Sequence, residues 1–275
     1  MPSEQDEAYR RIWQHLRQVS SVADGRHDSE EWRGKRGDFV MCCVRIPPDA
    51  LSSSLDQVHE TLGTFPYVRV HPKSFLHVTV QELGFLTDEP LRRGDITREW
   101  LDEFIGQAEN PVGEYSPFTI SLGGINSFVD AVFLDVHDGG WLSRIHGRLI
   151  DFVSVPPSNR YAYLPVVTIG HYTESAPIGN LVAALTPWRD RNFGTFRAES
   201  IDIVKLRTSV PYPDMELIHR FELGHQQRLI EMVQGTGSSG PSQPVISADP
   251  PVGIEAIEPI TSAGSSNFKR STRRR

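Results

Sequence analysis

One short segment with strict alternation of side-chain character constrains the fold of this chain most. Residues 75–85 read Phe-Leu-His-Val-Thr-Val-Gln-Glu-Leu-Gly-Phe. A period of two is typical of a β-strand, so the pattern places His77 and Thr79 on one face of a sheet and Val78 and Val80 on the other. The sequence therefore predicts a strand that presents an imidazole and a hydroxyl side by side.

A second segment repeats this pattern with one change. Residues 163–173 read Tyr-Leu-Pro-Val-Val-Thr-Ile-Gly-His-Tyr-Thr. Thr168 matches Thr79, whereas Val166 stands at the position that corresponds to His77. Two similar strands indicate an internally symmetric fold in which one half has lost its histidine.

These segments resemble the two His-x-Thr/Ser motifs of the 2H phosphoesterase superfamily, close to its bacterial 2′-5′ RNA ligase and cyclic phosphodiesterase branch. The resemblance extends over residues 38–224, from an opening strand at 38–47 to a closing hairpin near the end of that range. It implies an α+β fold. Two pseudo-symmetric lobes of antiparallel sheet, flanked by helices, would surround a central groove.

The chain divides into three parts by composition. We expect an N-terminal helix and loop over residues 1–37, the 2H-like domain over 38–226, and a disordered tail over 227–275 that is rich in Gly, Ser and Pro and ends in a basic tip. Apolar residues three and four apart predict helices at five places. They are residues 7–22, 51–62, 95–108, 141–152 and 178–192.

Charge and composition narrow the partners. A net charge of -7 and a pI near 5.8 argue against a general nucleic-acid binder, so we expect no DNA partner. A nucleotide or an RNA end with a cyclic phosphate stays compatible, because local charge governs binding of a small ligand. The sequence has no phosphate loop, no dinucleotide fingerprint and no zinc spacing, and we therefore expect no metal and no cofactor.

Two adjacent cysteines, Cys42 and Cys43, lie in an apolar strand and are expected to point to opposite faces as reduced, small hydrophobic residues. No secretory signal and no membrane-spanning apolar run is visible, so a cytoplasmic monomer without membrane contact is expected.

The chemistry of two facing His-x-Thr motifs follows from the residue types. One imidazole would take a proton from water and another would protonate the departing ribose oxygen, since the ordinary pKa of histidine is about 6.5. Thr79 and Thr168 would donate hydrogen bonds to the non-bridging phosphate oxygens. His77, Thr79 and Thr168 are therefore predicted catalytic residues, while Val166 cannot transfer a proton.

His171 is the nearest candidate for a replacement imidazole and is included among the predicted catalytic residues. Regular alternation sends it to the face opposite Thr168, unless a bulge at Gly170 re-aims the chain. The same alternation predicts that Tyr172 shares the face of Thr168, where it would line the groove, with a place in the core as the alternative. Arg207 is predicted to bind a phosphate.

Three functions remain open from the sequence. The first is a phosphoesterase acting on 2′,3′-cyclic or 2′-5′ phosphodiester bonds of RNA ends or small nucleotides, where hydrolysis and ligation use the same groups. The second is a catalytically degenerate module that binds a nucleotide or RNA end, and Val166 favours this hypothesis. The third is a structural or interaction protein that has kept only the fold.

Overall fold

The computed structural model describes residues 3–25, 37–153 and 163–224. The chain divides into two compact units, Met1–Thr236 and Gly237–Arg275, and all described residues belong to the first. The predicted disordered tail at 227–275 lies outside the described residues. The predicted part boundaries after residues 37 and 226 stay predictions.

The described residues form helices and strands in alternation. In chain order they are α1 (Glu4–Leu16), β1 (Ser21–Val22), β2 (Asp38–Arg45), η1 (Pro48–Ala50), α3 (Ser54–Gly63), β3 (Val68–Val70), η2 (Lys73–Phe75), β4 (His77–Leu86), β5 (Asp95–Ile96), α4 (Arg98–Gly113), β6 (Phe118–Ser127), β7 (Ala131–His137), α5 (Trp141–Ile150), β8 (Val166–Tyr172), β9 (Ala176–Pro177), α6 (Gly179–Leu185), η3 (Thr186–Trp188), β10 (Gly194–Ala198), β11 (Ser200–Leu206) and β12 (Glu216–Glu222). A helix is present at each of the five predicted places. The first of them ends early, at Leu16, and Ser21–Val22 form β1 instead of helix. The last also ends early, because α6 gives way to a 3-10 turn at Thr186.

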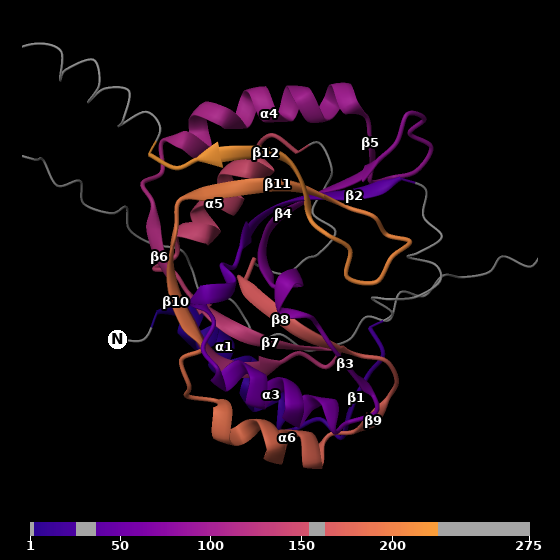
Figure 1. Ribbon diagram of the computed structural model, residues 1–275, viewed down its shortest axis with the longest axis vertical. Helices are drawn as coiled ribbons and strands as arrows, with labels where there is room; N and C mark the ends of the chain where they lie inside the picture. Colours follow the sequence, from indigo (N-terminus) through magenta and orange to yellow (C-terminus); the bar gives the residue numbers. More distant parts are fainter. Residues whose placement is uncertain (1–2, 26–36, 154–162, 225–275) are drawn as a thin grey trace, which may run out of the picture. The chain divides into compact units, whose positions relative to one another are not determined.

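One sheet organises the fold. Its strand order is β10-β6-β7-β8-β4-β2-β11-β12, with β3 added to β8 and β5 to β4. Every neighbouring pair along the main path is antiparallel. The two motif strands, β4 and β8, occupy the centre, and three strands follow on each side. Figure 1 shows the first lobe (β2, β4, β11, β12) above the second lobe (β6, β7, β8, β10). The predicted α+β fold with two pseudo-symmetric halves is confirmed.

The sheet has two faces with different cover. We call the face that carries His77 and Thr168 the motif face, and the opposite one the core face. Helices α3, α4, α5 and α6 contribute buried apolar side chains to the main core, to which Leu16 at the end of α1 also belongs. A smaller apolar cluster lies on the motif face of the first lobe: Phe39, Met41, Cys43, Phe85, Val204 and Leu206. Cys42 belongs to the main core and Cys43 to the smaller cluster, so the prediction that they point to opposite faces is confirmed.

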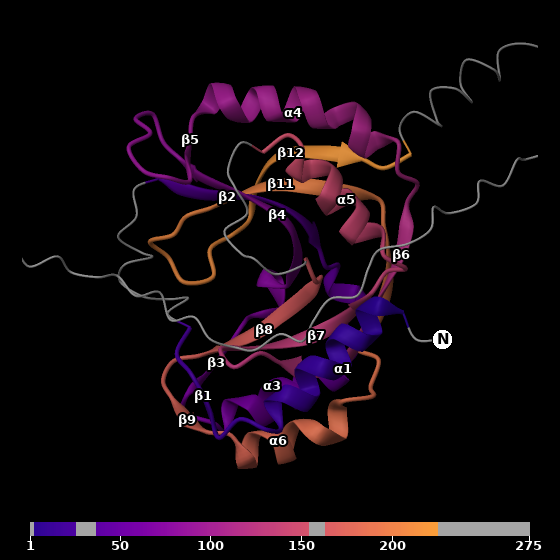
Figure 2. The ribbon, with the colours of Figure 1, turned by 180° about the vertical axis from the view of Figure 1, so that it is seen from behind.

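Helix α1 packs on the motif face of the second lobe. It begins with a capping box in which Ser3 and Asp6 satisfy each other's backbone amides. Its Tyr9 is 1% exposed, and the Tyr9 ring lies 6.4 Å from that of Phe133, the cross-strand partner of Thr168. Figure 2 shows α1 in front of the second lobe, with α3 behind it. The helix therefore covers strands that lie directly beside the second motif.

The two lobes are joined by very little sheet. Strands β4 and β8 share a single residue pair, Val78 with Val167. Beyond it, the carbonyl oxygen of Thr79 accepts a hydrogen bond from the Tyr163 hydroxyl at 2.8 Å, and Val80 O accepts one from His146 Nδ1 at 2.7 Å. The His146 and Tyr163 rings are stacked, with centroids 4.1 Å apart. Side chains thus replace the backbone ladder where the lobes diverge. Among the described residues, 3–25, 37–153 and 163–224, no helix has the length and apolarity to cross a membrane.

Candidate active site

The central pair of strands sets the geometry of the site. Four side chains on the motif face are half-exposed, whereas Val78, Val80, Val167 and Ile169 are buried. The four are His77, Thr79, Val166 and Thr168. Because Val78 is paired with Val167 in antiparallel register, His77 lies beside Thr168 and Thr79 beside Val166. An imidazole and two hydroxyls therefore meet on one face, as the sequence predicted, with a valine at the fourth corner.

His77 is held as a neutral base. Its Nδ1 lies 2.7 Å from the carbonyl oxygen of Phe75, which can only accept, so Nδ1 carries the proton. The Phe75 ring meets the imidazole edge to face at 5.4 Å. Burial lowers the pKa of His77 below its ordinary value, and the bond to Phe75 opposes this shift only in part. Near neutral pH the free electron pair therefore sits on Nε2.

The two threonines are available as donors. Thr79 Oγ1 has only a weak contact, 3.8 Å to Met41 Sδ. Thr168 Oγ1 has no hydrogen-bond partner among the described residues. Hydroxyls without strong protein partners can each donate to an oxygen of a bound phosphate. The hydrogen-bonding capacity of both motif threonines thus remains free on the motif face.

The position of the missing histidine is surrounded by fixed groups. Asp135 is the cross-strand partner of Val166 and is buried, with its carboxylate bonded to Arg189 Nη1 and, at 3.0 Å, to Asn126 Nδ2. Burial raises the pKa of Asp135, and the Arg189 charge and the Asn126 amide act against this shift. Arg189 reaches Asp135 past β6 at Gly124, where a Cβ atom would fall 1.5 Å from the Arg189 carbonyl oxygen.

Helix α1 closes the same region. The Tyr9 hydroxyl accepts from Val136 N at 3.1 Å and donates to Pro165 O, directly before Val166. Burial raises the pKa of Tyr9 far above its ordinary value, so this hydroxyl stays protonated and serves the backbone. Neither Tyr9 nor Asp135 is therefore free to take the place of the missing imidazole.

A bulge changes the faces of the residues at the end of β8. Val132 is paired with Gly170 and Phe133 with Thr168, so Ile169 is an extra residue without a partner on β7. One extra residue reverses the alternation that follows it. The expectation that His171 points away from Thr168 is therefore wrong: His171 is half-exposed on the motif face, where its Nδ1 lies 3.1 Å from His71 Nε2.

His171 nevertheless lies on the wrong side for the missing function. Along β8 it follows Thr168, which is beside His77, so His171 lies on the His77 side of the pair between Val78 and Val167. Position 166 lies on the other side of that pair. A water and a leaving oxygen occupy opposite sides of the phosphorus, and two groups on the same side cannot serve both. We therefore do not include His171 among the groups proposed to act in catalysis.

The same bulge moves Tyr172 into the core. Its side chain is 1% exposed, and its hydroxyl lies 2.6 Å from Ser127 Oγ. The Tyr172 ring packs at 6.3 Å from the Tyr67 ring. Tyr172 therefore does not share the face of Thr168, and the prediction that it binds substrate is corrected in favour of the core alternative.

Arg207 lies away from the motifs. It lines a pocket of about 360 Å³ together with Gly37, Asp38, Leu86, Thr208 and Ser209. Asp38 is paired with Leu86 at one end of β2 and β4, whereas Arg45 is paired with His77 at the other end. The full length of β4 therefore separates this pocket from His77 along the sheet. The expected phosphate contact of Arg207 at the motif site is corrected accordingly.

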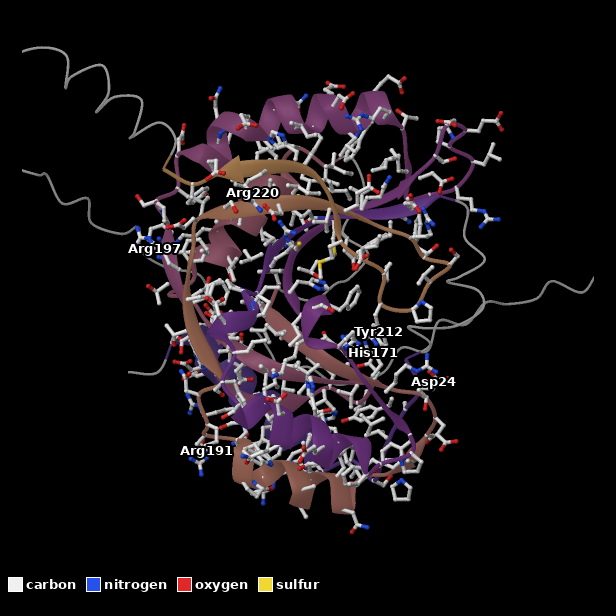
Figure 3. The ribbon with its side chains drawn as sticks, in the orientation of Figure 1. Asp24, His171, Arg191, Arg197, Tyr212 and Arg220 are labelled. Carbon is white, nitrogen blue, oxygen red and sulfur yellow. The ribbon has the colours of Figure 1, made fainter. Side chains whose placement is uncertain are left out.

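Sequence reasoning missed an aromatic group beside His77. The His71 ring lies 4.6 Å from the His171 ring and 4.9 Å from the Tyr212 ring, and Tyr212 lies 5.4 Å from Phe75. Figure 3 shows Tyr212 next to His171. Tyr212 is the one residue other than glycine with a positive φ, 49°, in the part of the chain that the structure describes. Its loop returns from β11 across the sheet, and no local pattern in the sequence indicates such a return.

A curved antiparallel sheet with two pseudo-symmetric motif strands at its centre is the architecture of a 2H phosphoesterase. The family model of the 2′-5′ RNA ligase superfamily matches residues 47–209, and the chain belongs to this family. No curated protein sequence matches the chain.

Solved structures agree on the fold. Escherichia coli LigT, crystallised with 3′-AMP, is 14% identical, with a TM-score of 0.50 and coverage of 68% of this chain and 98% of LigT. A structure described as a phosphoesterase is 12% identical, also with a TM-score of 0.50, and the alignment covers 68% of this chain and 99% of the phosphoesterase chain. At these identities the likeness extends to the fold and not to the chemistry.

Proposed function

We propose that this protein binds the 2′,3′-cyclic or 2′-5′ phosphodiester of an RNA end or small nucleotide and hydrolyses it slowly with His77 as its single general base. The observation that carries the proposal is the register of Val78 with Val167, because it brings His77 and Thr168 together from distant parts of the chain. The 3′-AMP in the LigT crystal belongs to that protein, and nucleotide binding is extended to this chain as part of the proposal.

The chemistry follows from the groups on the motif face. His77 Nε2 takes a proton from water as the oxygen attacks phosphorus, and the bond from phosphorus to one ribose oxygen breaks. Thr79 and Thr168 donate hydrogen bonds to the non-bridging oxygens, where negative charge develops. The leaving oxygen departs toward position 166 and receives its proton from solvent. Loss of one acid or base costs about 10²- to 10⁴-fold in rate, which is why slow turnover is proposed.

A second function is binding without turnover. The observation that favours it is the closed surroundings of Val166, with Asp135 bonded to Arg189 and α1 packed beside it. Under this hypothesis the threonines and His77 hold the phosphate, and the protein recognises RNA ends or nucleotides without altering them.

Calorimetry with 2′,3′-cyclic AMP, combined with chromatography of its products, tests both functions. We expect Thr168→Val to weaken binding and His77→Asn to abolish hydrolysis. Thr119→Val on β6 and His15→Asn on α1 are matched controls at exposed positions and leave both unchanged. Binding that depends on Thr168 without any product supports the second function. Binding that is indifferent to both His77 and Thr168 refutes the motif face as the site.

We further propose that the protein acts as a monomer in the cytoplasm, a setting that suits its two buried, free cysteines.

A further inference from the structure

A buried carboxylate between two arginines lies next to the motif site. Asp202 on β11 is 3% exposed, and its Oδ2 accepts from Arg45 Nε at 2.7 Å. Arg220 binds the same carboxylate with Nε to Oδ1 at 2.7 Å and Nη2 to Oδ2 at 2.9 Å. Burial raises the pKa of Asp202, but the bonds and charges of Arg220 and Arg45 outweigh burial and hold the pKa below its ordinary value. Asp202 is therefore ionised, and the three groups together carry one positive charge.

This cluster belongs to the motif face. Thr79 is paired with Cys43, Cys43 with Asp202, and Asp202 with Arg220, so one row of side chains crosses β4, β2, β11 and β12. Paired residues on neighbouring strands share a face. Arg45 is itself the cross-strand partner of His77. The row extends the motif site over the first lobe for about 14 Å, or three strand spacings.

Arg45 is not required to neutralise the buried carboxylate of Asp202. The two-pronged bond from Arg220 already compensates the charge of Asp202 in good geometry. Arg45 uses Nε alone, and among the described residues its Nη1 and Nη2 groups have no protein partner. Both arginine side chains remain about two-fifths exposed, 39% and 41%. Asp202 thus fixes Arg45 with its remaining donors directed to solvent.

The motif side chains themselves carry no positive charge near pH 7, although exposed Arg69 is paired with His171 farther along β8. His77 is neutral near pH 7 and the threonines are uncharged, while the phosphodiester carries a negative charge. Arg45 lies on β2, between β4 and β11. Its bond to Asp202 directs its side chain toward β11, and therefore away from a phosphate bound by His77 and Thr168. On the second lobe, Arg189 is occupied by Asp135 next to α1. The exposed Glu222 near Arg220 is screened by solvent.

From this placement we propose that Arg45 and Arg220 form a second phosphate site, which binds the phosphate on the 5′ side of the terminal nucleotide. The inference rests on the proposed function and narrows its substrate class to RNA oligonucleotide ends rather than mononucleotides. Asp202 is a positioning residue that holds both guanidinium groups, and the RNA strand runs from the motif strands toward β12.

Competition binding measures the inference directly. The probes are a fluorescent tetranucleotide that ends in a 2′,3′-cyclic phosphate and unlabelled 2′,3′-cyclic AMP as competitor. We expect Arg45→Gln to weaken binding of the tetranucleotide at least about tenfold. The same variant should weaken binding of 2′,3′-cyclic AMP less than about twofold. The slope of log affinity against log salt falls by about 0.7 for each phosphate of a single strand that the protein no longer neutralises. Arg197→Gln on β10, an exposed arginine at the sheet edge, is the charge-matched control and changes neither ligand.

Arg45→Gln folds, because Arg220 still compensates Asp202, and a thermal melt verifies this. Equal loss for both ligands, or no loss for either, overturns the inference. The proposed function is judged separately, by the effect of Thr168→Val on cyclic AMP. Arg45-dependent binding of the tetranucleotide that Thr168→Val and His77→Asn both leave unchanged supports the second phosphate site and refutes the motif face as the site of the terminal phosphate.

Discussion

Restoring an imidazole at position 166 tests the reasoning about the site most directly. We expect Val166→His to raise hydrolysis of 2′,3′-cyclic AMP at least about 10²-fold, because it supplies the proton that the leaving oxygen lacks. That factor corresponds to about 2.7 kcal/mol of transition-state stabilisation. The position is half-exposed, so a polar ring costs less there than in the core.

The structure also predicts how the new group titrates. Asp135 is the cross-strand partner of position 166, and a neighbouring carboxylate raises the pKa of an imidazole. The pKa of His77 is lowered by burial. The two imidazoles therefore separate into an acid and a base, and the pH profile of kcat/KM becomes bell-shaped, whereas the unmodified protein shows only the ascending limb.

Val166→Asn is the matched control, since it is polar at the same position but transfers no proton. Product formation is followed by chromatography and ligand binding by calorimetry. A folded Val166→His protein that binds cyclic AMP as the parent does, yet gains less than tenfold in rate, would falsify the assignment of position 166 to the leaving-group side.

The remaining predictions concern stability and the faces of β8. In the folded protein the pKa values of His77 and His146 are lowered, so the unfolded chain takes up protons at a higher pH than the folded one. The free energy of unfolding therefore decreases as the pH drops below about 6.5. Urea denaturation of His146→Gln is expected to show a smaller decrease over the same pH range. Tyr9→Phe removes the hydroxyl that accepts from Val136 N and donates to Pro165 O, and it costs about 1–3 kcal/mol in the same assay; a loss below measurement error contradicts these contacts. Tyr172→Phe is expected to lower the free energy of unfolding by about 0.5–1.5 kcal/mol without changing the affinity for 2′,3′-cyclic AMP. Weaker binding by a folded variant would contradict the placement of Tyr172 in the core.

The period of two predicted the motif strands and their faces correctly. His77 and Thr79 are half-exposed and Val78 and Val80 are buried, since alternation within a regular strand depends only on the strand itself. It failed for the two residues beyond Gly170, His171 and Tyr172. The extra residue is visible only in the register with β7, and the sequence does not show which residues of the two strands are paired.

Two other features depended on tertiary structure in the same way. The apolar spacing of α1 predicted a helix with a buried side, but not that this side would lie on the motif face against Phe133. Arg207 follows a strand of the first lobe, and only the register of Asp38 with Leu86 shows that it lies at the far end of β4. Sequence reasoning did not include Arg45 in the site, because only the pairing of β2 with β4 shows that Arg45 lies beside His77.

The narrow joint between the lobes has a consequence for how such a site varies. Where one residue pair links β4 to β8, the stacked His146 and Tyr163 act as a spacer that holds two backbone carbonyls from behind the reacting groups. A wider or narrower spacer would alter the separation of the Thr79 and Thr168 hydroxyls while leaving every motif residue in place. The separation of the two hydroxyls that we propose to bind the phosphate is thus set by side chains that do not contact the ligand.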